Sequence, residues 1–273
     1  MEISIDPKGF NALVKGKHGL VIYNKNDIYV GKAIQTYGEF SELETDLFKH
    51  YCHSGDVVVE VGSNIGAHTL SLSKMVGENG RVYAYEPQRI VFQTLCANMA
   101  INSIKNVECY QIAISSKDGS AFIPNIDYTV RGNFGGIEAD KAKTGEKVVM
   151  SRLQDILEVP RLNFLKIDVE GMEFSVIKGA KKLIEKHQPV IYLENDRPNK
   201  SESLIKTIWS MGYKAYWHLP PLFNPNNFAG NTENIFSKIV SVNMLCIPKS
   251  KEMTYPSLKE IVDANDHPMK NHQ

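Results

Sequence analysis

Residues 57–66 hold the pattern in this chain with the most chemical content: an apolar run, an acid and a Gly-x-x-x-Gly turn. Glu60 ends the run, Gly62 and Gly66 bound the turn, and an amphipathic segment begins at Ala67. This order predicts a strand, a tight loop and a helix. Glycine lets the backbone approach a ligand, and the helix N-terminus presents free N–H groups. Glu60 is placed to meet an amine or a hydroxyl.

A second acid follows the next apolar run, residues 82–85, where Glu86 precedes Pro87. One carboxylate at the tip of a second strand can accept hydrogen bonds from both hydroxyls of a ribose. Two acidic strand ends around a glycine loop therefore make a nucleoside site the leading hypothesis. The alternative is an α/β turn that binds no ligand.

Sequence motifs narrow the type of nucleoside that this predicted site could bind. A dinucleotide site favours G-x-G-x-x-G, and this loop has two of the three glycines. The P-loop string G-x-x-x-x-G-K-[ST] does not occur. S-adenosylmethionine carries a sulfonium, an ammonium and a ribose but no phosphate, so an acid beside the loop suits it better than it suits a pyrophosphate.

Strand and helix patterns alternate along the rest of the chain. Helices are predicted over residues 67–75, 89–101, 172–186 and 201–211, with a helical turn at 153–157. Strands are predicted over residues 107–114, 148–150, 164–168 and 190–194, with a closing antiparallel pair at 214–219 and 242–247. The Asp118-Gly119 turn predicts that residues 121–123 return antiparallel to 107–114. Residues 127–145 and 220–239 are predicted loops.

Alternating strands and helices predict an α/β fold with a doubly wound, mostly parallel sheet. Ligands of such sheets lie beyond the carboxyl ends of the strands. Glu60, Glu86, Asp168 and Glu194 each end a predicted strand, so we expect them to line one rim. The alternative for any single acid is a helix N-cap or a surface turn.

Composition excludes several classes of function. Lys+Arg and Asp+Glu balance at 31 each over 273 residues, so the chain lacks the basic excess expected of a nucleic-acid binder. The four cysteines form no C-x-x-C pair and are interpreted as reduced thiols of a cytoplasmic protein. The chain shows neither a signal-peptide pattern nor an apolar run of membrane-spanning length.

At these residues the chain resembles the FkbM-type methyltransferases that use S-adenosylmethionine. The matching strings are GDVVVEVGSNIG at 55–66, RVYAYEP at 81–87 and LKIDVEGME at 165–173. Looser matches are residues 98–102, 113–115 and 190–194, and the resemblance covers roughly residues 37–247. Many members of that family have Asp at the position of Glu60 and Ala at the position of Ser63.

The resemblance implies a Rossmann-like class I methyltransferase with a seven-stranded, mostly parallel sheet. We expect a small N-terminal extension over residues 1–50, the methyltransferase domain over 51–250 and a polar tail over 251–273. The implied reaction is methyl transfer from S-adenosylmethionine to a hydroxyl of a saccharide or a secondary metabolite. The alternatives are a methyltransferase of a peptide or another small molecule, and a non-catalytic protein that binds the cofactor.

The resemblance also implies which residues hold the cofactor. Its amino-acid part would be held by Glu60, Gly62, Ser63, Asn64 and Gly66. Glu86 would hold the ribose, and Ala113 and Ile114 would flank the adenine. Asp168 would face the methionine end beside the substrate, and Tyr37 would belong to an element that closes over the cofactor.

An alcohol acceptor must lose a proton, so a carboxylate or a histidine has to lie within hydrogen-bond reach. The candidate bases are Asp168, Glu170, Glu173, Glu194 and His218. A metal-assisted alternative would place Mg²⁺ on Asp168, Glu194 and Asn195, although nothing in the sequence requires a metal.

The acceptor is predicted to contact residues 217–234, where aromatic rings and asparagine amides alternate as they do in many sugar-binding surfaces. The alternative is an ordered loop packed by its own aromatics. We therefore expect a small-molecule or glycan substrate and no nucleic-acid partner. An N6-adenine methyltransferase would show Asn/Asp-Pro-Pro-Tyr where Asp168-Val169-Glu170-Gly171 stands, and a C5-cytosine enzyme would need a Pro-Cys pair.

Overall fold

A mostly parallel sheet forms the centre of the computed structural model, which describes residues 2–3, 6, 8–137, 142–251 and 257–272. Its eight strands lie in the order β14-β12-β13-β11-β10-β4-β5-β6. Their bounds are β4 (Val57–Val61), β5 (Arg81–Tyr85), β6 (Val107–Tyr110), β10 (Phe164–Ile167), β11 (Val190–Glu194), β12 (Tyr213–His218), β13 (Asn243–Pro248) and β14 (Lys259–Glu260). The predicted α/β, Rossmann-like fold is confirmed, and the two-residue β14 adds an eighth strand at one edge.

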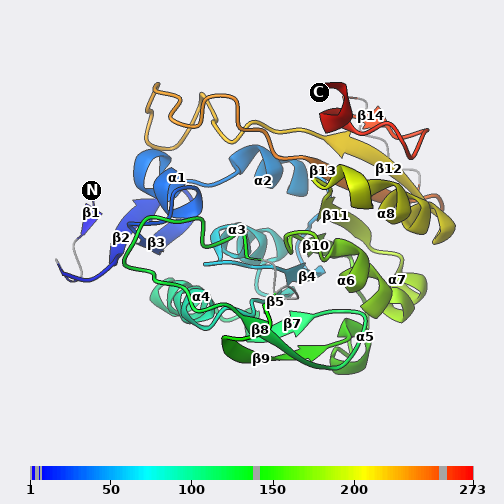
Figure 1. Ribbon diagram of the computed structural model, residues 1–273, viewed down its shortest axis with the longest axis horizontal. Coiled ribbons are helices and arrows are strands. Elements are labelled where there is room, and N and C mark those ends of the chain that lie inside the picture. Colours follow the sequence, from blue (N-terminus) through cyan, green and yellow to red (C-terminus); the bar gives the residue numbers. More distant parts are fainter. Residues whose placement is uncertain (1, 4–5, 7, 138–141, 252–256, 273) are drawn as a thin grey trace.

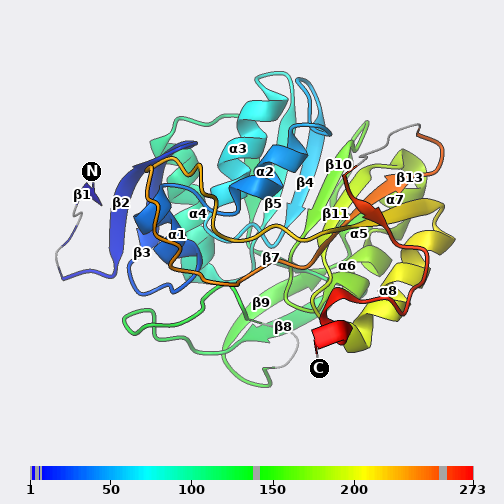
Figure 2. The same cartoon turned by 90° about the horizontal axis from the view of Figure 1, so that it is seen from above.

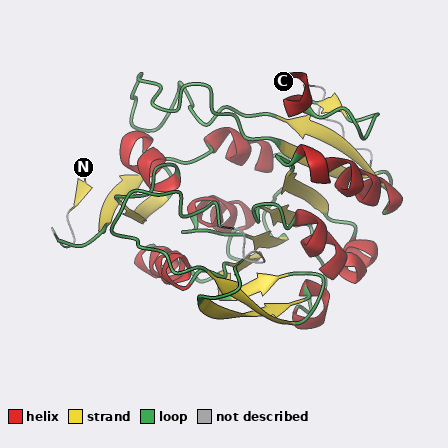
Figure 3. Ribbon diagram, viewed as in Figure 1, coloured by secondary structure: helices red, strands yellow, loops and turns green. Residues whose placement is uncertain are grey.

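Five strands from β6 to β11 are parallel, and β13 runs opposite to both of its neighbours. Helices cover both faces of this sheet (Figure 3). On one face, alternate β4 residues pack against α6 (Glu173–Gly179), α7 (Lys181–His187) and α8 (Pro198–Ser210). On the other face, Val58 packs with residues of α2 (Glu42–Phe48) and α3 (Ala67–Val76). Because both faces are buried, the strands read as continuous apolar runs.

The N-terminal strands pack against the helix that follows β5. β2 (Asn11–Gly16) and β3 (Gly19–Asn24) form a hairpin with β1 (Glu2–Ile3) at its edge, and α1 (Val30–Tyr37) follows. Apolar residues of the hairpin share a core with α3 and with α4 (Arg89–Ile101). Two α4 amides hold the backbone of β3, since Ile22 N donates to Asn98 Oδ1 at 2.7 Å and Leu20 N donates to Asn102 Oδ1 at 2.8 Å.

A second small sheet corrects the predicted hairpin. β7 (Ile112–Ile114) and β8 (Gly119–Ile123) do not pair with each other, because β9 (Glu146–Ser151) lies between them. β9 is parallel to β7 and antiparallel to β8. The buried side chains of Val148 and Met150 join a cluster of their own on this sheet, and this apolar packing outweighs the local turn chemistry. The predicted strand 107–114 is accordingly divided between two sheets.

Some of the predicted helices have the observed bounds and others do not. α4 has the predicted bounds and α5 (Leu153–Ile156) is the predicted helical turn, whereas the predicted helix 172–186 is two helices that meet at Ala180. At the end of α6, a Cβ on Gly179 would lie 1.9 Å from the carbonyl oxygen of Ser115, so a glycine is required there. Among the described helices, none is long and apolar enough to cross a bilayer.

Two long segments lie over the carboxyl ends of the strands. The connection between β12 and β13 reaches across α2 to α1, far from its own strands (Figures 1 and 2). Of the predicted loop 127–145, residues 138–141 lie outside the described residues. The predicted tail is described over residues 257–272, where Ile261 and Ala264 are buried in the main core and β14 pairs with β12. Residues 252–256 and 273 of that tail, and residues 1, 4–5 and 7 of the predicted extension, lie outside the described residues.

Candidate active site

A cavity of about 480 Å³ lies at the rim where β5, β4, β10 and β11 end. Glu60, Glu86, Asp168 and Glu194 all line it. A narrower pocket of about 50 Å³ shares Gly62, Glu86 and Asp168 with the cavity. Its other walls are mainly apolar, with Tyr85, Pro87, Ile112, Ala113, Ile114 and Met172 among them. The four acids predicted to share one rim therefore meet around one continuous hollow.

The glycine loop lets two strand ends come together. Gly62 has a φ of +82°, and a Cβ there would lie 1.8 Å from the carbonyl oxygen of Asp168. Gly66 caps α3 with a φ of +87°, but its Cβ would meet Leu95, so it serves helix packing and does not line the cavity. Ser63 lines the cavity and its hydroxyl donates to the carbonyl of Glu60 at 3.1 Å.

Glu86 is held by backbone donors at the cavity wall. Its carboxylate accepts from Asn64 N at 3.0 Å and from Gln88 N at 2.9 Å, and the residue is 5% exposed. Burial raises the pKa of Glu86 to about 7, although these two hydrogen bonds act in the opposite direction. Each carboxylate oxygen keeps a lone pair that can accept from a ligand hydroxyl.

Lys166 is a functional residue that the sequence reasoning missed. Its side chain is 2% exposed within β10, and its ammonium lies 3.2 Å from Asp168 Oδ2 and 3.6 Å from Glu60 Oε1. Thr69 Oγ1 donates to the other oxygen of Glu60 at 2.6 Å. Burial lowers the pKa of Lys166, but attraction to Asp168, Glu60 and Glu44 outweighs it and raises that pKa above its ordinary value. A lysine inside an otherwise apolar strand was the available signal.

Three carboxylates converge beyond Lys166. Asp168, Glu170 and Glu194 each place an oxygen within 4.8 Å of the others. Arg197 pairs with Glu170 at 2.9 Å and also with Asp196. Oε2 of Glu194 is buried and has no hydrogen-bond partner among the described residues.

The proton affinities of this group follow from burial and mutual repulsion. Burial, with the charge of Asp168, raises the pKa of Glu170 to about 7 even though Arg197 opposes the change. Burial and the charges of Asp168 and Glu170 raise the pKa of Glu194 well above its ordinary value. Both carboxyls therefore take up a proton near neutral pH more readily than a surface glutamate does.

Four other predicted site residues lie outside the cavity lining: Glu173, His218, Tyr37 and Asn195. His218 Nδ1 is 2.8 Å from the hydroxyl of Tyr192, and burial lowers the pKa of His218 to about 4. The Tyr37 hydroxyl donates to the Glu233 carbonyl at 2.7 Å and accepts from Ile235 N at 2.9 Å. Asn195 is 3% exposed and its amide donates to Ser201 Oγ at 2.8 Å. The structure thus groups Glu170, in place of Asn195, with Asp168 and Glu194.

One side of the cavity is closed by segments from both ends of the chain. Leu222, Val240 and Val242 come from the long β12–β13 connection, and Phe40 comes from the segment between α1 and α2. Residues of the loop predicted at 127–145 also contribute, and Gln88 Nε2 donates to the Phe134 carbonyl at 2.8 Å.

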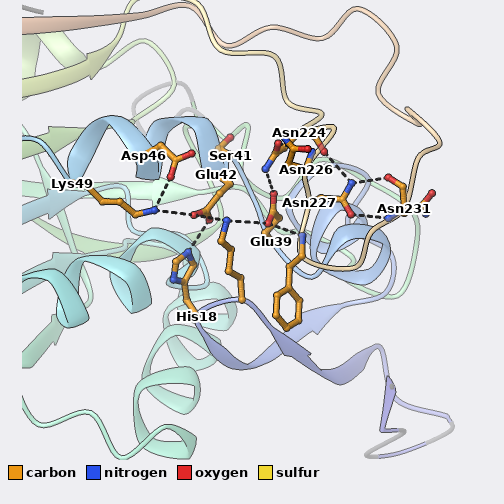
Figure 4. A network of polar contacts seen from close by, with 12 residues as sticks. His18, Glu39, Ser41, Glu42, Asp46, Lys49, Asn224, Asn226, Asn227 and Asn231 are labelled. Carbon is orange, nitrogen blue, oxygen red and sulfur yellow. Dashed lines mark hydrogen bonds and ion pairs between the residues drawn. The ribbon is translucent and has the colours of Figure 1, made fainter.

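The asparagines predicted to bind a sugar are used within the protein. Asn224 Nδ2 donates to Glu39 Oε1 at 2.7 Å, and Asn227 Nδ2 donates to the carbonyls of Asn224 and Asn231 (Figure 4). Within the predicted acceptor segment 217–234, Leu222 lines the cavity. The aromatic and amide pattern therefore serves mainly to fold the loop.

One family model matches the part of the chain that contains this site. The model described as the methyltransferase FkbM domain matches residues 60–215. "Methyltransferase 1" of Beauveria bassiana is 28% identical over 183 residues, covering 56% of this chain and 71% of the relative. The "hexuronic acid methyltransferase AglP" of Haloferax volcanii is 31% identical over 124 residues, covering 45% of this chain and 49% of the relative.

Among solved structures, the chain is similar to an FkbM methyltransferase from Methylobacillus flagellatus. The identity is 17% and the TM-score 0.49, with 74% of this chain and 50% of that chain covered.

Proposed function

The chain belongs to the FkbM methyltransferase family, and from this premise we propose that it is an O-methyltransferase acting on a hydroxyl of a saccharide or a secondary metabolite. The family makes S-adenosylmethionine the methyl donor. The observation that carries the proposal is the cavity itself, because strand-end carboxylates inside the matched segment surround one hollow at the rim.

The cavity fits this donor by its residues. Glu86 offers two buried carboxylate oxygens to a ribose, and the apolar pocket beside it, with Ala113 and Ile114, suits a flat adenine ring. The missing side chain of Gly62 lets the backbone at Asp168, after β10, approach the end of β4. When bound, S-adenosylmethionine supplies a methyl group on a positively charged sulfur.

Glu194 is the proposed acceptor of the substrate proton. Asp168 is paired with Lys166, Glu170 with Arg197, and Glu173 accepts from Gly171 N at 2.9 Å. Glu194 keeps one buried oxygen without a partner among the described residues, and its raised pKa makes its carboxylate a stronger proton acceptor than that of an ordinary glutamate. Leu222 and Val242 of the β12–β13 connection add buried apolar walls on this side.

Two measurements test the proposal in sequence. Calorimetry should detect binding of S-adenosylmethionine and of its demethylated product. The protein should then release S-adenosylhomocysteine with at least one acceptor from a panel of sugars and lipid-linked glycans. Glu86→Ala should weaken donor binding in the calorimetric titration. Binding without turnover on any hydroxyl acceptor would indicate a non-catalytic protein or a different acceptor class. No binding by well-folded protein would overturn the proposal.

A further inference from the structure

The cavity proposed for donor and acceptor is rich in carboxyl groups. Among the described residues, seven acidic side chains line it: Glu44, Glu60, Glu86, Asp168, Glu170, Glu194 and Asp196. Two cationic side chains of the same part of the chain line it, those of Lys166 and Arg197. His68 also lines the cavity, and it is neutral because burial and the charge of Lys166 hold its pKa well below the ordinary value. The donor brings one net positive charge, so the carboxyl groups of the lining still outnumber the positive charges in the cavity.

Neither cation is free to meet an anionic ligand. Lys166 is 2% exposed and lies between Glu60 and Asp168. Arg197 is held by Glu170 and Asp196. An anionic acceptor would therefore face carboxylates with no unused positive charge among the described residues that line the cavity, and like charges placed together at a binding site oppose association.

Glu194 adds an observation that points to a ligand. Its Oε2 is buried and has no partner among the described residues, and one of its carboxylate oxygens lies within 4.8 Å of oxygens of Asp168 and Glu170. A buried carboxylate without a partner is unfavourable unless a proton or a cation reaches it. Glu194 ends β11, whereas Glu86 follows β5, and β4 and β10 lie between these strands. The unpaired oxygen is thus on the side of the cavity away from the proposed ribose site.

We propose that the carboxyl groups of Glu44, Asp168, Glu170 and Glu194 receive a cationic group of the methyl acceptor, so that the preferred acceptor is an amine-bearing saccharide and an anionic one is rejected. The inference rests on the proposed function and names its substrate class. An amino sugar carries an ammonium and a hydroxyl on neighbouring carbons. Carboxylate oxygens within 4.8 Å of one another can contact both groups at once.

A divalent metal ion is the competing occupant of this group. Two of the three carboxylates already contact a cationic side chain, Asp168 with Lys166 and Glu170 with Arg197. A metal ion would lie beside both positive charges, and this geometry favours a singly charged ammonium.

The test compares three glycosides that share a glucose-type ring and carry different charges: the 4-nitrophenyl glycosides of glucosamine, with an amine at C2, of glucose, and of glucuronic acid, with a carboxylate at C6. Each is titrated into protein saturated with S-adenosylhomocysteine, once in EDTA and once in Mg²⁺. The glucosaminide should bind at least about tenfold more tightly than the glucuronide, with the glucoside between them and no dependence on Mg²⁺. Glu194→Gln should reduce the differences in affinity among the three glycosides. Glu185→Gln, an exposed change on α7, should leave these differences intact.

The outcomes separate this inference from the function on which it rests. Equal affinities, a preference for the glucuronide, or no binding of the glucosaminide to the product-saturated protein would overturn the inference and leave the methyltransferase proposal standing. Acceptor binding that requires Mg²⁺ would assign the carboxylate group to a metal ion. Failure of S-adenosylhomocysteine itself to bind would remove the proposed function.

Discussion

At the scale of single residues, burial gives ordinary carboxyls unusual proton affinities. Glu86 and Glu170 both have a pKa of about 7, in each case chiefly because burial disfavours the charged form. They differ in their partners. Glu86 accepts from two backbone N–H groups, whereas Glu170 is held by Arg197. The same pKa therefore serves two purposes, a fixed acceptor for a ligand hydroxyl and a member of a charged group.

The role of Glu86 predicts how donor affinity changes with pH. Its carboxylate, the form that accepts from both ribose hydroxyls, is lost as pH falls through about 7. Glu86→Gln should weaken donor binding by roughly 1–3 kcal/mol at pH 8, and the difference from the wild type should shrink at pH 6. Calorimetric titrations at both pH values measure it. An unchanged dissociation constant at pH 8 would remove the ribose assignment.

Glu194 predicts an effect on rate. If its unpartnered oxygen accepts the proton of the substrate, Glu194→Gln should lower kcat by about 10²–10⁴-fold and leave donor affinity nearly unchanged. His218→Gln should have little effect, because His218 contacts Tyr192 and lies outside the cavity lining. Steady-state kinetics with the best acceptor of the panel would show it. A large loss in His218→Gln with a small one in Glu194→Gln would transfer the role to the histidine.

At the scale of elements, the sequence predicts those features of the fold that local residue patterns determine. The acids that end β4, β5, β10 and β11 share a rim because parallel strands put their carboxyl ends on one edge. The place of β9 between β7 and β8 could not be predicted, since the Asp118-Gly119 turn is local and the pairing of Val148 depends on packing. Lys166 was missed because two of the carboxylates that attract it, Glu60 and Glu44, lie far from it in the sequence.

The β12–β13 connection predicts an effect that separates donor from acceptor. Tyr37 contacts this connection twice through its hydroxyl and packs against Phe223 and Phe236. Tyr37→Phe keeps the ring and removes both hydrogen bonds, a loss of about 1–2 kcal/mol.

We therefore expect faster amide exchange at Ile235, a raised KM for the acceptor and an unchanged donor affinity in Tyr37→Phe. Hydrogen exchange and calorimetry test the three together, with Tyr51→Phe, which lies in the core between α2 and the sheet, as a second tyrosine variant. Weakened donor binding in Tyr37→Phe alone would favour the cofactor-closing role predicted from the sequence.

At the scale of the whole molecule, distant parts of the chain close one site. Tyr29 and Phe40 come from the N-terminal part, Asp168 from the middle, and Val240 and Asn243 from near the C-terminal end. Glu39 joins two of these parts, because it accepts from Asn224 Nδ2 and from Phe228 N (Figure 4). Such long-range contacts carry no local sequence signal, and for this reason the acceptor wall could not be predicted as well as the donor side.

The walls of this site bury carboxyl groups, so the stability of the ligand-free protein should depend on pH. Burial raises the pKa of Glu44 from 4.5 to about 7, although Lys166 opposes the change. The folded state therefore favours the protonated carboxyl. Its stabilising contribution is complete below pH 4.5 and is lost as pH rises through about 7. Glu44→Gln, which stays neutral, should raise the free energy of unfolding over the wild type by on the order of 1–3 kcal/mol at pH 8.

Urea unfolding at pH 8 and pH 5 measures this effect for Glu44→Gln, with the exposed Glu185→Gln as the control. The gain should shrink at pH 5, where the wild-type carboxyl is also neutral. A gain independent of pH would show that the pKa of Glu44 is the same in the folded and the unfolded protein. A cationic ligand should reduce the gain at pH 8, because a positive charge near Glu44 stabilises its ionised form. The acidity of the cavity thus links substrate charge to the stability of the whole fold.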